Sequence, residues 1–148
     1  MLEKIKASLF KEYNAEEKKW VFLSWFTWSK DLLVSQWVCD TDLPLYQTLE
    51  SIYQEHIEPV IKQLWYIVVD IVVELIELED TNNIREMDPK EYGVIVVDQE
   101  DDKSWVILPN TEWIVDMKWA LFAIKKQYWV HGKISIAVFR TERIIFSK

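Results

Sequence analysis

Glycine is nearly absent from this sequence. The 148 residues include two glycines and nine tryptophans, whereas average usage would supply roughly ten glycines. Trp28, Trp113 and Trp129 stand in segments that suit tight turns, where glycine is the usual residue because it adopts positive φ without strain. One hypothesis is that the gene reads UGA as glycine, and that the tryptophans are UGA codons translated as tryptophan. The alternative is a hydrophobic core rich in tryptophan.

Cysteine and positive charge are also scarce. Cys39 is the single cysteine, so an internal disulfide is excluded and a reducing, cytoplasmic location is expected. Seventeen Lys and Arg residues stand against 25 Asp and Glu residues, which gives a net charge of −8. The basic residues are scattered and form no stripe, so we expect no nucleic acid partner.

The sequence lacks a hydrophobic run long enough to cross a membrane. The longest apolar stretch, residues 64–76, is interrupted by Asp70 and Glu74, and a spanning helix needs about 20 apolar residues. Residues 1–14 carry charges where a secretory signal would have an apolar centre. We therefore expect a cytoplasmic protein with no membrane partner.

Apolar and charged residues are present in a globular balance. Half of the residues are apolar and 28% are charged, which predicts one domain over residues 1–148. Apolar spacing predicts helices over 2–13, 43–65 and 115–128. Runs of aromatic and β-branched residues predict strands over 20–28, 32–39, 66–78, 94–98, 104–109 and 134–146. Because hairpins outnumber helical crossovers, this order predicts an α+β fold: a mainly antiparallel sheet with covering helices.

Two of the helices carry boundary signals. Asp42 is a candidate N-cap for the second helix, and Pro59 should kink or divide it. Asn110 or Thr111 is a candidate cap for the third helix. The residues expected on the buried side of that helix are Val115, Trp119, Leu121, Phe122 and Ile124. An irregular acidic connection is expected over residues 79–92.

Cys39 is the candidate nucleophile, with His56 and His131 as the available imidazole bases. Asp40 and Asp42 stand beside the cysteine and disfavour the thiolate that a nucleophile needs. A buried, unreactive thiol at the end of a strand is therefore the favoured interpretation.

Acidic clusters in the sequence are poor candidates for a metal site. Around His56, only Glu55 and Glu58 have the i, i+3 spacing of ligands on a helix, so a solvated helix face is favoured. The acidic residues within 98–102 lack the spacing of a calcium loop, and a hydrated hairpin tip is favoured. The sequence contains no glycine-rich phosphate loop and no serine nucleophile elbow. We therefore expect no metal and no cofactor.

Several segments between residues 67 and 146 form a recognisable series. They are the strand IVVDIVVELIELED, the YGVIVV strand at 92–97, the WVILPNTEW block at 105–113, the MKWALFAIKKQYW helix at 117–129 and the closing IAVFRTERI strand at 136–144. This series resembles the AMMECR family, which comprises the AMME syndrome candidate protein and its relatives. The family pattern has glycine where Trp105 stands, which favours the glycine hypothesis for the tryptophans.

The first half of the chain fits the family more loosely. WVFLSWF and LPLYQTLESI resemble an early strand of the family and the helix after its most characteristic motif. That motif, LRGCIG, would fall near Leu33–Cys39, where this chain reads LVSQWVC. The arginine is absent, the glycine positions are not met, and Cys39 does not align with the motif cysteine without a shift.

The resemblance implies an α+β protein with two subregions in one compact unit and no established molecular activity. The leading hypothesis is a non-catalytic binding or regulatory domain for an unknown protein or small-molecule ligand. Its expected groove lies between the first hairpin and the sheet, near Ser35, Gln36, Cys39 and Asp40. A second hypothesis is an enzyme that modifies a nucleotide or a protein through Cys39 and a histidine. A third is an interaction module whose exposed tryptophans dock a partner.

Overall fold

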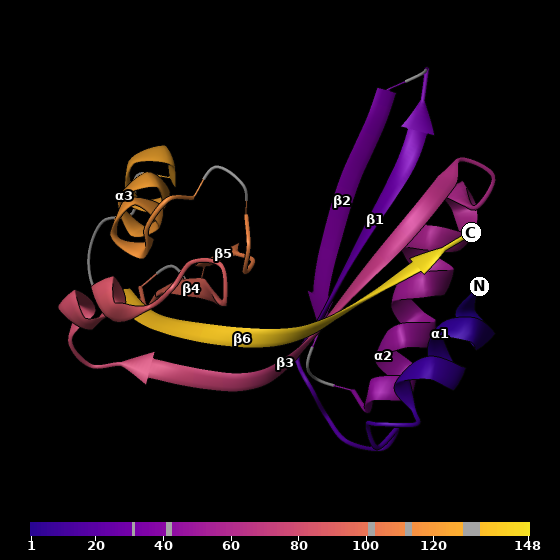
Figure 1. Cartoon of the computed structure of the whole chain (residues 1–148), viewed down its shortest axis with the longest axis horizontal. Coiled ribbons are helices and arrows are strands. Elements are labelled where there is room, and N and C mark those ends of the chain that lie inside the picture. The colour runs from indigo at the N-terminus through magenta and orange to yellow at the C-terminus, as the bar shows by residue number, and fades with distance from the viewer. Residues whose placement is uncertain (31, 41–42, 101–102, 112–113, 129–133) are drawn as a thin grey trace. The chain divides into compact units, whose positions relative to one another are not determined.

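The computed structural model of the chain describes all residues except 31, 41–42, 101–102, 112–113 and 129–133. The side chains of residues 29, 32–40, 81–82, 125 and 127–128 are also not described. The main elements are α1 (Leu2–Leu9), β1 (Val21–Ser29), β2 (Leu32–Asp40), α2 (Leu45–Ile52), β3 (Leu64–Leu78), β4 (Tyr92–Asp98), β5 (Lys103–Ile107), α3 (Met117–Tyr128) and β6 (Ile134–Ser147) (Figure 1). They follow the predicted order, and the α+β prediction is confirmed. In the part of the chain that is described, no helix is long and apolar enough to cross a membrane.

The strands are hydrogen-bonded in the order β2-β1-β3-β6-β4-β5. The pairs β1–β2, β1–β3, β4–β5 and β4–β6 are all antiparallel, as the sequence predicts. β2 and β5 therefore lie at the two edges of this order. The β-branched residues that dominate β3 and β6 explain why these long segments are strands, because such side chains pack well on a pleated surface.

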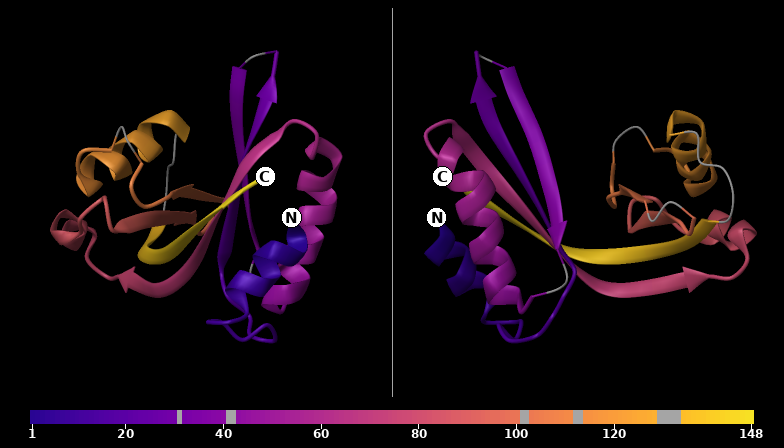
Figure 2. Two further views of the ribbon diagram at one scale, coloured as in Figure 1. Left: turned by 45° about the vertical axis from the view of Figure 1, so that its right-hand side comes forward. Right: turned by 180° about the vertical axis from the view of Figure 1, so that it is seen from behind.

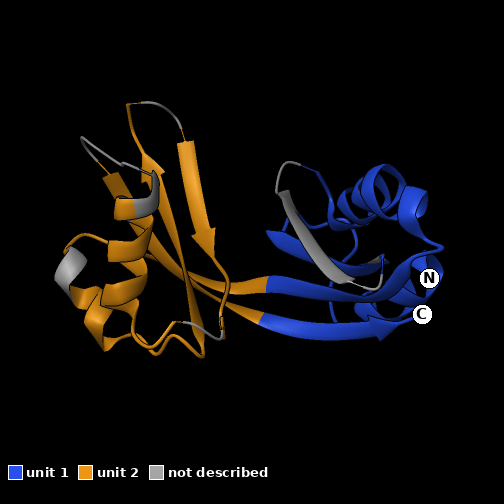
Figure 3. Cartoon of the chain, turned by 90° about the horizontal axis from the view of Figure 1, so that it is seen from above, with its two compact units in different colours: residues 1–71, 142–148 blue, residues 72–141 orange. Residues whose placement is uncertain are grey.

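The chain divides into two compact units (Figure 3). Unit 1 consists of residues 1–71 and 142–148, and unit 2 consists of residues 72–141. The two long strands β3 and β6 run through both, so each unit contains a part of each strand. Whether the two units form the single domain expected over residues 1–148 is not decided by this division, so the single domain stays a prediction.

In unit 1, helices α1 and α2 cover one face of the strands (Figures 1 and 2). Alternate residues of β1 and β3 point to that face, because side chains alternate along a strand. The buried hydrophobic core of unit 1 contains Ile5, Leu9, Val21, Leu23, Trp25, Leu45, Leu49, Ile52, Ile57, Leu64, Ile67, Val69, Ile71 and Phe146. α1 contributes Ile5 and Leu9 at i, i+4 spacing and ends at Leu9, four residues before its predicted end.

The second helix is also shorter than predicted. α2 ends at Ile52, and the chain continues through a π-helical turn and a 3-10 turn up to Val60. Pro59 explains the break, since it lacks an N–H and its ring clashes with the carbonyl four residues earlier. At the start of the helix, Pro44 occupies the N-cap position. The predicted cap, Asp42, lies outside the described residues.

In unit 2, α3 packs against β4 and the neighbouring strands. The core of this unit contains Ile84, Val94, Val96, Ile114, Met117, Ala120, Leu121, Ile124, Ile136 and Val138. Ile84 lies in a 3-10 turn over Thr81–Glu86, within the connection that the sequence predicts to be irregular. Gly93 in β4 lies opposite Phe139 in β6. A Cβ atom at this glycine would lie 2.4 Å from Phe139 Cζ and 2.5 Å from the carbonyl oxygen of Ile107, so only glycine fits this site.

Asp116 caps α3, which begins two residues later than predicted. Its Oδ1 accepts a hydrogen bond from the backbone N–H of Trp119 at 2.6 Å, the bond that an N-cap side chain makes to the first turn. Asn110 has a φ of 59°, and the Thr111 hydroxyl donates to the carbonyl of Leu108 at 2.8 Å. The two predicted caps therefore belong to the preceding loop.

The buried side of α3 is only partly the predicted one. Val115, Trp119 and Phe122 are 77%, 42% and 59% exposed, whereas the sequence predicts them to be buried. The residues that face the core are Met117, Ala120, Leu121 and Ile124. The prediction failed for a physical reason: this helix carries apolar residues on two opposite faces, and periodicity alone does not say which face is covered.

Candidate functional site

The four predicted binding residues lie on β2, an edge strand of unit 1. Ser35 is in register with Phe26 of β1, and Cys39 is in register with Phe22. Gln36 and Asp40 are in register with Trp25 and Val21, which point to the helix-covered face. Cross-strand partners share a face of the sheet, so the four positions divide two and two between the faces. Their side chains are not described, and the groove between them stays a prediction.

Cys39 belongs to β2, and His56 belongs to the π-helical turn over Tyr53–Ile57. The His56 ring stacks on Trp25 at a centroid separation of 5.6 Å, and Trp25 belongs to the core under the helices. Cys39 is paired in register with Phe22 of β1. The Cys39 side chain is not described, so a Cys39–His56 catalytic pair stays a prediction. The other imidazole, His131, lies outside the described residues.

Two tryptophans lie together on the surface of unit 1. The indole rings of Trp28 and Trp65 are stacked, with centroids 5.3 Å apart and planes inclined by 28°. Their side chains are exposed to solvent at 46% and 48% of their areas. Exposed aromatic rings in contact are uncommon on a surface that has no partner, because they leave a continuous apolar area in water.

Two further rings extend this pair into a row. Trp65 meets Tyr66 edge-on, with centroids 5.1 Å apart and an angle of 78°. Tyr66 in turn stacks on Phe26, with centroids 4.2 Å apart and an angle of 14°. These are the offset and edge-to-face arrangements that aromatic pairs prefer. We call the set Phe26, Trp28, Trp65 and Tyr66 the aromatic surface.

The strand backbone holds the aromatic surface in place. Phe26 and Tyr66 are opposite each other in the β1–β3 pairing, and the register shifts by a bulge directly after Phe26. Beyond the bulge, the N–H of Trp28 donates to the carbonyl of Gln63 at 2.9 Å. The N–H of Lys148 donates to the carbonyl of Trp65 at 3.2 Å. The bulge turns the strand end, as bulges do, and brings the two indoles side by side.

The charges next to the aromatic surface are positive. Lys30 follows Trp28 by two residues, Lys62 precedes Trp65 by three, and Lys148 is paired through its backbone with Trp65. Segments 20–30, 59–69 and 144–147 contain no acidic residue, in a chain whose net charge is −8. The acid at position 31, which follows Lys30 in the sequence, lies outside the described residues. Along the sequence, the aromatic residues are therefore flanked closely by lysines.

The described residues contain no group of three or more His, Cys, Asp and Glu side chains placed to hold a metal ion. His56 Nε2 lies 3.9 Å from a carboxylate oxygen of Glu55, whereas Glu58 interacts with Tyr53. Burial raises the pKa of the Tyr53 phenol, and the negative charge of Glu58 raises it further. This geometry is that of a solvated helix end.

The tryptophans bear on the glycine hypothesis through their backbone angles. Among the described residues other than glycine, positive φ occurs at Lys30 and Asn110. Trp28 lies within β1, as the predicted strand over 20–28 has it and not in a turn, and glycine is not required there by φ. Trp113 and Trp129 lie outside the described residues. The glycine hypothesis itself stays a prediction.

Sequence reasoning missed the aromatic surface because it read Trp28 as a residue of the hairpin turn region and placed Trp65 in a helix. The available signal was their position at facing strand ends, Trp28 closing one predicted strand and Trp65 preceding the next. A bulge that aligns them is not visible in the spacing of the sequence.

Comparison with known proteins shows the fold and no activity. No family model matches the sequence, and no curated protein matches it. Among solved structures, the chain is similar to an uncharacterized protein from Pyrococcus horikoshii, with a TM-score of 0.63 and 18% sequence identity. The similarity covers 98% of this chain and 90% of that one, so it extends over both units and supports the α+β architecture throughout.

Proposed function

We propose that this chain is a non-catalytic binding module of the AMMECR type, which holds a protein partner on the aromatic surface of unit 1. The observation that supports the proposal is the stacked and half-exposed pair Trp28–Trp65. Tryptophan dominates the energetics of interfaces because one side chain buries a large apolar area at a small cost in conformational entropy. Two indoles in contact form a rigid apolar platform of this kind.

The lysines beside the platform favour an acidic partner. An apolar segment that carries carboxylates places its side chains on the indole rings and its charges near Lys30, Lys62 and Lys148. Extended proline-containing segments suit such a surface, since aromatic platforms accept the polyproline II conformation and this conformation is already populated before binding. The proposed partner is therefore an extended, acidic segment containing proline and apolar residues.

The predicted binding residues extend the same surface in part. Ser35 lies in register with Phe26, so its position continues the row of Phe26 and Tyr66 across to the edge strand. Cys39 and Asp40 lie four and five residues further along β2. The proposal therefore includes Ser35 at the border of the surface and assigns no role to the thiol of Cys39.

A peptide-binding experiment tests this proposal. The probe is a fluorescently labelled peptide of repeated Glu-Pro-Leu triplets, and the comparison peptide has Lys in place of each Glu. Fluorescence anisotropy of the full chain should show binding of the acidic peptide and weaker binding of the basic one. Trp65→Ala should weaken binding roughly 30-fold, since truncation of a hot-spot residue costs about 2 kcal/mol.

Trp119→Ala is the matched control, because Trp119 is exposed to a similar degree but belongs to unit 2. It should leave the binding of the proline-containing peptide unchanged. Equal losses for Trp65→Ala and Trp119→Ala, or equal affinity for the two peptides, would overturn the proposal. Circular dichroism of each variant separates loss of binding from loss of folding.

A further inference from the structure

The outer face of α3 is apolar although it lies in solvent. Trp119 and Phe122 stand at i, i+3 spacing within α3, and Val115 precedes the helix by two residues; all three are exposed. At 100° per residue Trp119 and Phe122 lie along one stripe, on the side opposite the core-facing residues of the helix. A surface helix ordinarily carries polar residues there. We call Trp119 and Phe122, with Val115 just before the helix, the outer face of α3.

A hollow adjoins this face in unit 2. It has a volume of about 520 Å³ and is lined by Trp119, Phe122, Ala123 and Lys126. The Lys126 ammonium lies 5.9 Å from the centroid of the Phe122 ring, within the range of a cation–π contact. The hollow is therefore walled by aromatic rings, with a positive charge at its border.

The charges of α3 are all of one sign. Its charged residues are Lys118, Lys125 and Lys126, and the helix contains no acidic residue, in a chain with 25 acidic residues and 17 basic ones. Lys125 and Lys126 stand in the last turn, where cations are stabilised by the helix dipole. Lys118 stands in the first turn, where the dipole disfavours a cation. Compensation of the dipole therefore does not account for the whole set.

We infer that the outer face of α3 docks an acidic amphipathic helix of a partner protein, with Trp119 and Phe122 as apolar anchors and the lysines of α3 opposite its carboxylates. The spacing of the anchors is that of helix-in-groove recognition, in which apolar residues at i, i+3, i+4 and i+7 meet an apolar face. The inference is independent of the aromatic surface, because every residue that it uses lies in unit 2.

Charge argues against the other occupants of such a face. Two copies of α3 would bring lysines against lysines, and like charges in an interface are unfavourable. An anionic membrane would attract the lysines of this helix but would repel a chain of net charge −8. An acidic helix satisfies both the apolar anchors and the lysines.

The test uses the full chain and a synthetic helical peptide with Leu at i, i+3, i+4 and i+7 and Glu at the exposed positions between them. A second peptide carries Lys in place of Glu. NMR chemical shifts of the labelled chain should change along α3 with the acidic peptide, and less with the basic one. Phe122→Ala should weaken binding by roughly tenfold or more, because it removes an anchor.

Charge reversal separates specific recognition from non-specific hydrophobic binding. Lys126→Glu should weaken binding of the acidic peptide and strengthen binding of the basic one. Ile145→Ala, an exposed apolar residue of unit 1 outside both surfaces, is the matched control and should change neither. The inference is overturned by shifts that map outside α3, by equal binding of the two peptides, by unchanged affinity of Phe122→Ala, by stronger binding to phosphatidylglycerol vesicles, or by concentration-dependent dimers that Phe122→Ala abolishes.

Discussion

The Nε of Arg143 donates a hydrogen bond to Oδ1 of Asp70 at 2.8 Å, which joins β6 to β3 within unit 1. The Asp70 side chain is fully buried, whereas 35% of the Arg143 side chain is exposed. Asp70 is also one of the two residues that interrupt the longest apolar stretch of the sequence. A buried carboxylate in a β-branched strand is costly unless it is paired, so Arg143 makes the polar position in β3 tolerable.

Arg143→Met should destabilise unit 1 by about 3 kcal/mol, because it leaves the charge of Asp70 buried without this partner. The measurement is the free energy of unfolding in urea. The double variant Asp70→Asn, Arg143→Met should be more stable than the single variant Arg143→Met, since the buried charge is then removed as well. Additive effects of the two single substitutions would show that the pair is not coupled.

Gly93→Ala should destabilise the chain by about 2 kcal/mol through overpacking. The new methyl group would meet the Phe139 ring and the carbonyl oxygen of Ile107. Phe139→Leu in the same chain should restore only part of the loss, because the clash with the backbone carbonyl remains. Phe139→Leu alone is the control for the cavity that the smaller side chain leaves. Wild-type stability of Gly93→Ala would contradict the close approach of the strands.

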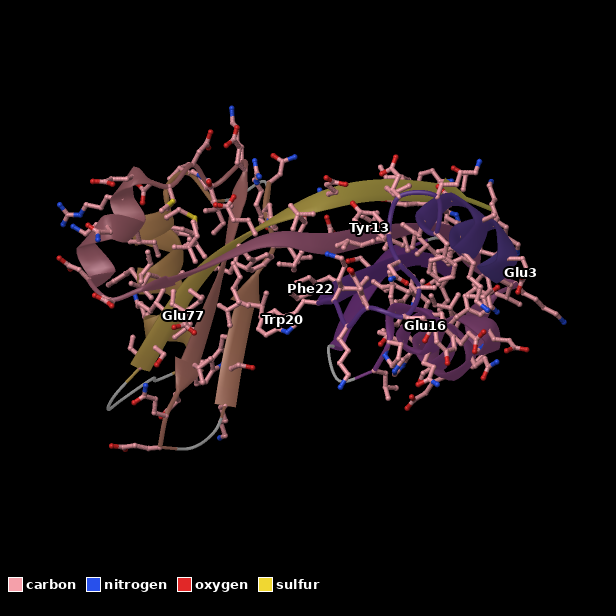
Figure 4. The ribbon with its side chains drawn as sticks, turned by 90° about the horizontal axis from the view of Figure 1, so that it is seen from below. Glu3, Tyr13, Glu16, Trp20, Phe22 and Glu77 are labelled. Carbon is pink, nitrogen blue, oxygen red and sulfur yellow. The ribbon has the colours of Figure 1, made fainter. Side chains whose placement is uncertain are left out.

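The alkaline limit of stability should depend on Tyr13 (Figure 4). Burial, followed by the hydrogen bond that its hydroxyl donates to Glu142, raises the pKa of this phenol above its ordinary value of 10.0. A phenol whose pKa is higher in the folded state stabilises that state while it is protonated. This contribution is present in full below the unfolded pKa and is lost as pH rises through the folded one.

Tyr13→Phe should therefore lower stability at neutral pH and flatten its decline above about pH 10. Part of the decline in stability at high pH should remain in this variant, because Lys6 and Tyr53 also titrate there. The hydrogen bond to Glu50 raises the pKa of Lys6 above 10.5, and burial raises that of Tyr53, so both act in the same direction. Urea unfolding across the alkaline range measures the slope, and an unchanged slope would exclude a contribution from Tyr13.

Asp116→Ala should destabilise α3 by about 1 kcal/mol, because the N–H of Trp119 loses its cap. Asp116→Asn should retain most of the stability, since an amide oxygen also caps. Thermal unfolding followed by circular dichroism gives the comparison. Thr111→Ala is the matched control, because Thr111 was predicted to cap the helix but belongs to the preceding loop. It should have a smaller effect on the helix.

The strands were predictable from the sequence because runs of β-branched and aromatic residues favour the pleated strand conformation. β3 and β6 begin and end within two residues of the predicted limits. The second helix was overextended because apolar spacing continues past Pro59, where the backbone cannot remain α-helical. In α3, a second apolar stripe competed with the true one, and only tertiary contacts decide which stripe is buried. The candidate surface was missed for a related reason, since a bulge and not the spacing brings Trp28 and Trp65 together.

The mass of the protein from its native source should decide the status of the tryptophans. If UGA encodes glycine in that source, the intact mass will be lower than that of the printed sequence by the difference between tryptophan and glycine at each recoded position. Expression of the printed sequence from a gene with standard tryptophan codons supplies the reference. A native mass equal to the reference would exclude recoding and leave both indole surfaces intact. A mass lower by nine such differences would remove Trp28, Trp65 and Trp119 from the natural protein. Binding of the peptides should then fail with the native chain and persist with the tryptophan-containing reference.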